Sequence, residues 1–114
     1  MNSTRLALAL GEVAMNPTGY RDDFYDWLLA NGHIYLAFER EADQIRARGR
    51  LHYSHRTIWE YLRHETALRE IDGEFKMNDN FTKYVALLYT RMHPEAGQFF
   101  SFRSVSVGDM ARAA

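Results

Sequence analysis

The side chains best suited to binding chemistry in this 114-residue chain gather between positions 46 and 58. The run Gly49–Ile58 holds Arg50, His52, His55 and Arg56, and two more arginines stand just before it at positions 46 and 48. Guanidinium groups form charge-assisted hydrogen bonds with phosphate and carboxylate groups, and phosphates dominate the affinity of proteins for DNA. The cluster therefore predicts a binding surface for an anionic partner, with double-stranded DNA as the first candidate.

Ser54 gives the clearest helix-start signal in the chain. Its hydroxyl can accept a backbone N–H two or three residues further on, as a helix N-cap does. The preceding segment, about 33–48, carries apolar residues at helical spacing and ends at Gly49. Two helices joined in this way indicate a helix-turn-helix arrangement, in which the second helix lies in the major groove.

On this hypothesis the helix that begins at Ser54 recognises the duplex, and the residues that contact it fall into three groups. The first faces base edges, the second binds phosphate through hydroxyl and backbone N–H groups, and the third flanks the DNA backbone. The base-facing group is His55, Arg56, Trp59 and Arg63. The phosphate-binding group is Ser54 and Thr57, and the flanking group is Arg48, Arg50, His52 and Lys76.

Two features of the sequence oppose DNA binding. The link from Gly49 to Ser54 is longer than the three- or four-residue turn usual in this motif. Acidic residues also lie close by at positions 60, 65, 70 and 74, and the net charge of the chain is −1. Any DNA contact must therefore depend on a local patch, and a solvated helix face or a protein-binding surface remains an alternative.

The elements around this cluster predict a mainly α fold with one β-hairpin (α+β), of winged helix-turn-helix type. The hairpin is expected at about 67–78, because Asp72-Gly73 lies between short alternating segments. A first helix follows Asp22-Asp23 and stops at Asn31-Gly32, with Gly32 in the left-handed closing position. A last helix is expected at about 81–92, and the His93-Pro94 pair terminates it.

Length and composition fit a single domain at 20–103, preceded by a weakly structured arm at 1–19 and followed by a flexible tail at 104–114. Residues 1–15 of the arm have the pattern of a short amphipathic helix. The absence of Cys favours the cytoplasm, and no apolar run approaches the ~20 residues of a membrane span. No catalytic or cofactor motif occurs, so the chain is not expected to be an enzyme.

The histidines and aromatic residues permit other interpretations. Zinc needs three or four converging ligands, and His55 and His64 would lie on opposite sides of one helix, so no metal is expected. Tyr53, Trp59 and Tyr61 could stack on single-stranded bases. Most rings are expected in the core, with Phe100 buried apart from Phe99 and Phe102 if that segment is extended. Large rings left exposed would indicate a homodimer or a partner surface.

Four stretches carry a resemblance to a known group: His52-Tyr53-Ser54-His55-Arg56-Thr57-Ile58, then Leu62-Arg63, then Glu74-Phe75-Lys76-Met77-Asn78-Asp79-Asn80-Phe81-Thr82, and the Phe99-Phe100 … Arg103 ending. Over about 24–103 the chain resembles small uncharacterised bacteriophage and prophage proteins. The resemblance transfers no activity and no functional residue. It implies a phage setting in a bacterial host cell, where such small proteins act as repressor-like DNA binders or as inhibitors of a host or phage protein.

Overall fold

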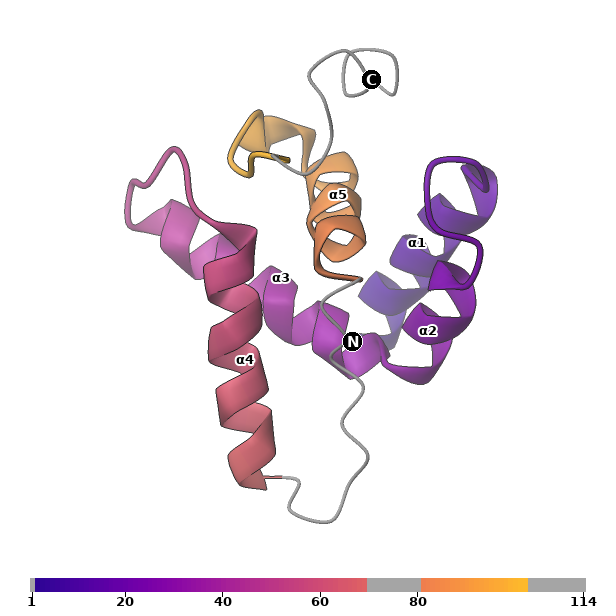
Figure 1. The fold of residues 1–114 in the computed structure, drawn as a ribbon. Coiled ribbons are helices and arrows are strands. Elements are labelled where there is room, and N and C mark those ends of the chain that lie inside the picture. Colours follow the sequence, from indigo (N-terminus) through magenta and orange to yellow (C-terminus); the bar gives the residue numbers. More distant parts are fainter. Residues whose placement is uncertain (1, 70–80, 103–114) are drawn as a thin grey trace.

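The computed structural model describes residues 2–69 and 81–102, with side chains at 4–65 and 81–102. Over these residues the regular structure is helical (Figure 1). The predicted helices around 24–31, 33–48 and 81–92, and the one that follows Ser54, are confirmed. Their observed bounds, with those of an N-terminal helix and a short 3-10 turn, are α1 Asn2–Met15, α2 Phe24–Ala30, α3 Gly32–Ala47, α4 His55–Arg69, α5 Thr82–Met92 and η2 Pro94–Ala96.

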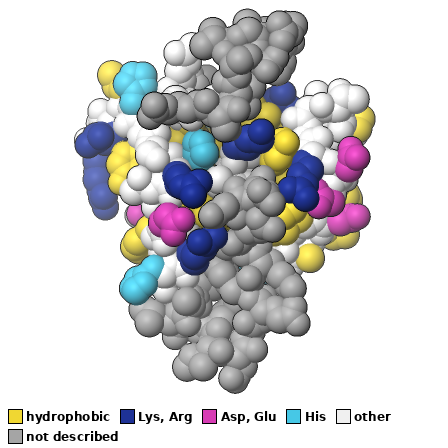
Figure 2. Space-filling model, in the orientation of Figure 1, with side chains coloured by type: hydrophobic (Ala, Val, Ile, Leu, Met, Phe, Trp, Pro, Cys, Tyr) yellow, Lys and Arg dark blue, Asp and Glu magenta, His cyan; other side chains and the backbone are white. Residues whose placement is uncertain are grey.

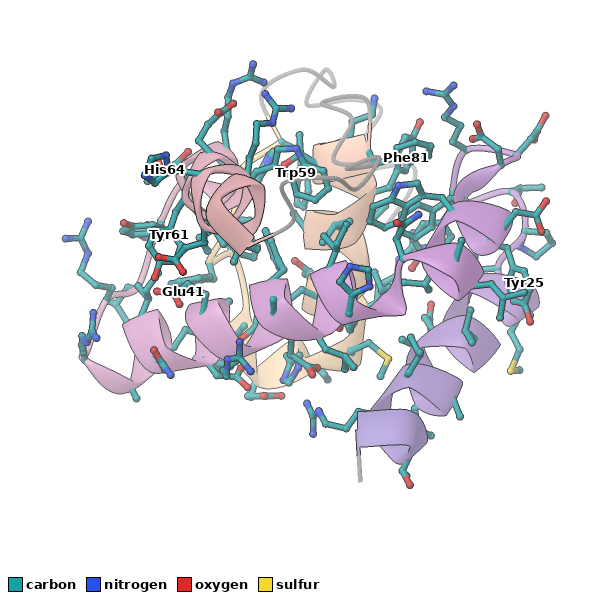
Figure 3. The ribbon with its side chains drawn as sticks, turned by 90° about the horizontal axis from the view of Figure 1, so that it is seen from below. Tyr25, Glu41, Trp59, Tyr61, His64 and Phe81 are labelled. Carbon is teal, nitrogen blue, oxygen red and sulfur yellow. The ribbon has the colours of Figure 1, made fainter. Side chains whose placement is uncertain are left out.

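Helix α3 is the central element, because α1, α2, α4 and α5 all pack against it. Helix α4 runs across one half of α3, and α1 and α2 lie at the other end (Figures 1 and 3). Apolar side chains repeat along α3 at Ile34, Phe38, Ala42 and Ile45, and all are buried, as their spacing predicts.

The core is rich in aromatic rings that come from different helices. Phe24 and Trp27 of α2 stack on each other, and Trp27 stacks on Phe81 with ring centroids 5.0 Å apart. Phe38 of α3 packs against Tyr89 and Phe100. Aromatic pairs of this kind add about 0.5–1.5 kcal/mol each beyond the area they bury, so these contacts fix how the helices lie on one another.

The predicted winged-helix fold with its β-hairpin is wrong. The described residues contain helices and no strand, and 67–69, where the hairpin was expected to begin, form the last turn of α4. Ala67-Leu68-Arg69 are strong helix formers, and alternation over so few residues does not distinguish a strand from a helix. The rest of the predicted hairpin, 70–78, lies outside the described residues.

Gly32 does not close α2 in a left-handed conformation. It is the first residue of α3, and the glycines with positive φ among the described residues are Gly49 and Gly97. A Cβ at position 32 would overlap the side chain of Leu6. Glycine therefore permits the close approach of α1 to the start of α3, which the local sequence did not reveal.

The segment predicted as an N-terminal arm contains helix α1 of the structure. Ala9 and Val13 are buried, and Leu6 and Leu10 pack against the same core. The helix ends at Met15, and the Asn16 side chain donates a hydrogen bond to the Glu12 carbonyl. The tail predicted at 104–114 lies outside the described residues. None of the described helices has both the length and the apolar character needed to cross a membrane.

Candidate nucleic-acid interface

The turn between α3 and α4 begins at Gly49, whose φ of 94° lies in the left-handed region. Its N–H donates to the Arg46 carbonyl at 2.9 Å, which closes the last turn of α3. A glycine adopts this conformation without the steric penalty of a Cβ. The chain can therefore leave α3 sharply and carry the basic residues out of the helical core.

Contacts with a distant segment hold the second half of this turn in place. The Tyr53 N–H donates to the Phe99 carbonyl at 2.9 Å, and the two rings stack. His52 Nδ1 lies 3.1 Å from the carbonyl oxygen of Gln98, and the Arg50 guanidinium lies over the Tyr53 ring, 5.5 Å from its centroid. The turn is thus anchored on 98–99, although its outer side chains are exposed.

Ser54 caps α4, as predicted. Its Oγ accepts a hydrogen bond from the Thr57 N–H at 3.2 Å, and the Ile58 N–H lies 3.4 Å from its carbonyl oxygen. This bond occupies the Thr57 N–H, so the predicted phosphate contact through that backbone group is not open. The Thr57 side chain is exposed next to the cap.

Arg48, Arg50, His52 and Arg56 are all exposed around this capped helix end. We call these four residues the basic turn. Lys and Arg side chains line the left edge of the molecule in Figure 2, at the height of the α3–α4 turn of Figure 1. Arg48, Arg50 and His52 are thus exposed within one short turn, and Arg56 is exposed in the first turn of α4 that follows it.

His55 does not face outward as predicted. Its Nδ1 lies 3.1 Å from Thr82 Oγ1 of α5, and its ring packs against Phe100 and Phe102. Burial, reinforced by the neighbouring Arg56 charge, lowers the pKa of His55. His55 therefore joins α4 to α5 and the 100–102 segment as a neutral side chain, and does not reach a base edge.

Trp59 is also turned inward. Its side chain is fully buried, and its ring centroid lies 6.1 Å from that of Trp27 (Figure 3). On the same helix Arg63 is half-buried and pairs with Glu60 at 3.7 Å. Lys76 lies outside the described residues. Of the predicted base-facing residues, Arg56 alone is exposed in the described structure.

The exposed face of α4 is not basic along its length. Glu60, Tyr61 and His64 follow Arg56 on that face, and Figure 3 shows Tyr61 and His64 on the side of α4 away from Trp59. Along α4 the exposed arginines therefore end with Arg56 in the first turn, although Lys and Arg side chains occur elsewhere on the surface (Figure 2).

The prediction for the aromatic segment 99–102 was also wrong. Strand-like alternation would bury Phe100 apart from Phe99, but both side chains are buried.

A polar network that was not predicted from the sequence surrounds Glu39, whose side chain is 4% exposed. Arg5 of α1 binds both carboxylate oxygens, at 2.7 and 2.6 Å. His93 Nε2 lies 2.8 Å from Oε2, and the Tyr35 hydroxyl donates to the same oxygen at 3.3 Å. The signal was the position of Glu39 between buried Tyr35 and Ala42 on the inner face of α3.

A second part of this network reaches the surface. The Tyr89 hydroxyl donates to Asp43 at 2.6 Å and accepts from Arg46 at 3.0 Å, while Arg46 and His93 both contact Glu95. Arg46, which belongs to the basic cluster in sequence, is therefore held against acidic groups and is not part of the basic turn. The network ties α1, α3, α5 and η2 together.

The network shifts the pKa values of its two central groups in opposite directions. Burial alone would raise the pKa of Glu39, but hydrogen bonds from His93 and Arg5 outweigh it and lower the pKa to about 2. The hydrogen bond to Glu39 raises the pKa of His93 above its ordinary value of 6.5. The folded state therefore favours the ionised carboxylate and the imidazolium together.

The stability of the fold should follow these titrations. The contribution of His93 is complete below its unfolded pKa near 6.5 and is lost as pH rises through its higher folded value. We expect the difference in unfolding free energy between the wild type and His93→Gln to narrow by on the order of 1 kcal/mol between pH 6 and pH 9. Urea denaturation at a series of pH values measures this difference, and a constant difference would contradict the assignment.

Glu39 affects stability at the acidic end of the pH range. Its contribution to the free energy of unfolding declines as pH falls from about 4.5 toward 2.

Comparison with protein-family models, curated sequences and solved structures found no match. The described residues also contain no group of three or more His, Cys, Asp or Glu side chains able to hold a metal ion.

Proposed function

We propose that this chain is a DNA-binding protein, and that the basic turn and the first turn of α4 contact the duplex backbone. The observation that carries this proposal is the common exposure of Arg48, Arg50, His52 and Arg56 around the end of α4 that Ser54 caps. Arginine binds phosphate oxygens with charge-assisted, often bidentate, hydrogen bonds. The Thr57 hydroxyl lies beside these groups and adds a neutral phosphate ligand.

The geometry favours binding to phosphates over extensive reading of bases. His55 and Trp59 are occupied in the core, and the face of α4 beyond Arg56 carries Glu60. Arg56 is the one predicted base-facing residue that the described structure leaves exposed. We therefore propose binding with limited reading of bases, in which Arg56 contacts a phosphate as Arg48 and Arg50 do.

The resemblance to small phage and prophage proteins supports a regulator that acts on DNA inside a bacterial host. This places the proposed activity in the host cytoplasm, where that DNA is. No step of the proposal requires catalysis or a cofactor.

Binding of a fluorescently labelled duplex of random sequence, followed by anisotropy at low salt, tests the proposal. Arg56→Ala should weaken binding by at least about 1 kcal/mol, or about fivefold. Arg40→Ala is the matched control, because Arg40 is exposed on α3 about 12 Å along the helix from Arg48. Equal losses in the two variants would show that overall charge matters and the basic turn does not.

A protein-binding function is the second candidate, and the surface of α1 and α2 favours it. Leu8 and Met15 of α1 are 61% and 83% exposed, and Tyr25 and Leu29 of α2 are 39% and 59% exposed. Exposed apolar groups of this size suit a protein partner. The two functions are separable, because Leu29→Ser alters α2 and leaves the basic turn intact. A host or phage protein bound by the wild type and lost with Leu29→Ser would support the second function.

A further inference from the structure

Leu51 at the tip of the α3–α4 turn is an unusual residue for its position, since its side chain is 77% exposed. It stands between Arg50 and His52, and Arg48 lies three residues before it. Leu29, an exposed leucine of α2, follows Asp22, Asp23 and Asp26 instead. An apolar tip among cations suits a polyanion, whereas the acidic surroundings of Leu29 would repel one.

The turn is fixed on both sides of Leu51. Gly49 sets the exit from α3, and the Tyr53 N–H and His52 ring are bonded to the carbonyls of Phe99 and Gln98. Arg50 also lies over the Tyr53 ring. A turn that is already held in one conformation loses little conformational entropy when it enters a narrow site. The exposed Leu51 side chain can therefore insert into a partner at low entropic cost.

We propose that Leu51 is a wedge that enters the minor groove of duplex DNA and partly unstacks one base step, while Arg48 and Arg50 bind the flanking phosphates. This inference rests on the proposed DNA-binding function and adds a mode of recognition to it. Proteins that bind the minor groove insert apolar side chains in this way and bend the duplex. Flexible pyrimidine–purine steps such as TA are deformed most readily, so they should be the preferred sites.

The wedge predicts a sequence preference without hydrogen bonds to bases. The energy needed to unstack a step differs between sequences, and the protein would bind more tightly where that energy is smaller. This agrees with a surface in which His55 and Trp59 do not reach the DNA. Insertion also explains why an apolar side chain stands at this position, since phosphate binding alone would not need one.

The test uses the full chain and a duplex with 2-aminopurine beside a central TA step and a donor–acceptor pair at its ends. On wild-type binding we expect 2-aminopurine fluorescence to rise and the ends to approach each other. Leu51→Ala should lose both signals and the preference for the TA duplex, while its affinity for a duplex without that step falls less than threefold. Leu29→Ala, the matched exposed-leucine control, should behave like the wild type.

The outcomes separate the wedge from the proposed function. Duplex binding that weakens with Arg56→Ala but gives no Leu51-dependent fluorescence or bending overturns the wedge and leaves DNA binding in place. Absence of duplex binding at low salt overturns both. Vesicles of anionic phospholipid are a third arm, and Leu51-dependent binding to them without any change in 2-aminopurine would also overturn the wedge.

Discussion

Trp59→Ala should lower the free energy of unfolding by about 3–5 kcal/mol, the range for removing a large aromatic side chain from a core. Trp59 is fully buried, and its ring lies against Trp27 of α2. The cavity would open between α4 and the aromatic core. Because a domain of this kind is stable by only about 5–15 kcal/mol, the variant should unfold at a much lower urea concentration.

Tyr61→Ala is the control for this prediction, since Tyr61 is on the same helix and 48% exposed. Its effect should stay within about 1 kcal/mol, as for most surface substitutions. Urea denaturation followed by circular dichroism measures both variants. Comparable losses of stability, or a Trp59→Ala variant as stable as the wild type, would contradict the inward orientation of Trp59. Trp59→Phe gives a milder test, because the indole N–H has no hydrogen-bond acceptor among the described residues.

Glu39→Gln is the second large effect that we expect, with a loss of about 2–3 kcal/mol in unfolding free energy. Removing one partner of a buried ion pair leaves the other charge uncompensated, which costs about 3–5 kcal/mol. We expect the smaller loss of about 2–3 kcal/mol for Glu39→Gln because the Arg5 side chain is 49% exposed and water screens its charge. His93 would also lose the carboxylate that raises its pKa.

The less buried pair of Glu60 and Arg63 provides the comparison for Glu39. Their side chains are 50% and 37% exposed and lie 3.7 Å apart, so Glu60→Gln should change stability by less than about 1 kcal/mol. The pKa of His93, followed by nuclear magnetic resonance, should fall in Glu39→Gln and stay constant in Glu60→Gln. An unchanged His93 pKa in Glu39→Gln would show that the network does not link these groups.

Most helices were predictable because their signals are local. Ser54 at the start of α4 and the repeat from Ile34 to Ile45 each follow from the chemistry of a few neighbouring residues. The hairpin failed because the alternation at 67–71 is short, and the helical preference of Ala67-Leu68-Arg69 prevails over it there. Gly32 was misassigned because its function is a contact with Leu6, which is distant in sequence.

The candidate site was predicted in part, and the errors share one physical cause. Arg48, Arg50, His52 and Arg56 lie on the surface because charged groups are expensive to bury. His55 and Trp59 were assigned to the same surface from their place on the helix, but α5 and the 100–102 segment cover His55, and Trp59 packs against Trp27 of α2. A periodicity along one helix identifies two faces, and only the positions of the other elements determine which of them is covered.

The most direct test of DNA binding through the basic turn is the salt dependence of duplex affinity. Three arginine–phosphate contacts predict a slope of about −3 for log K against log [salt], so raising salt from about 50 to 200 mM should weaken binding by about 50-fold. Arg56→Ala should reduce the magnitude of the slope by about 1, and Arg40→Ala should leave it unchanged. No detectable binding at the lowest salt concentration, or a slope that the two substitutions change equally, would contradict the account.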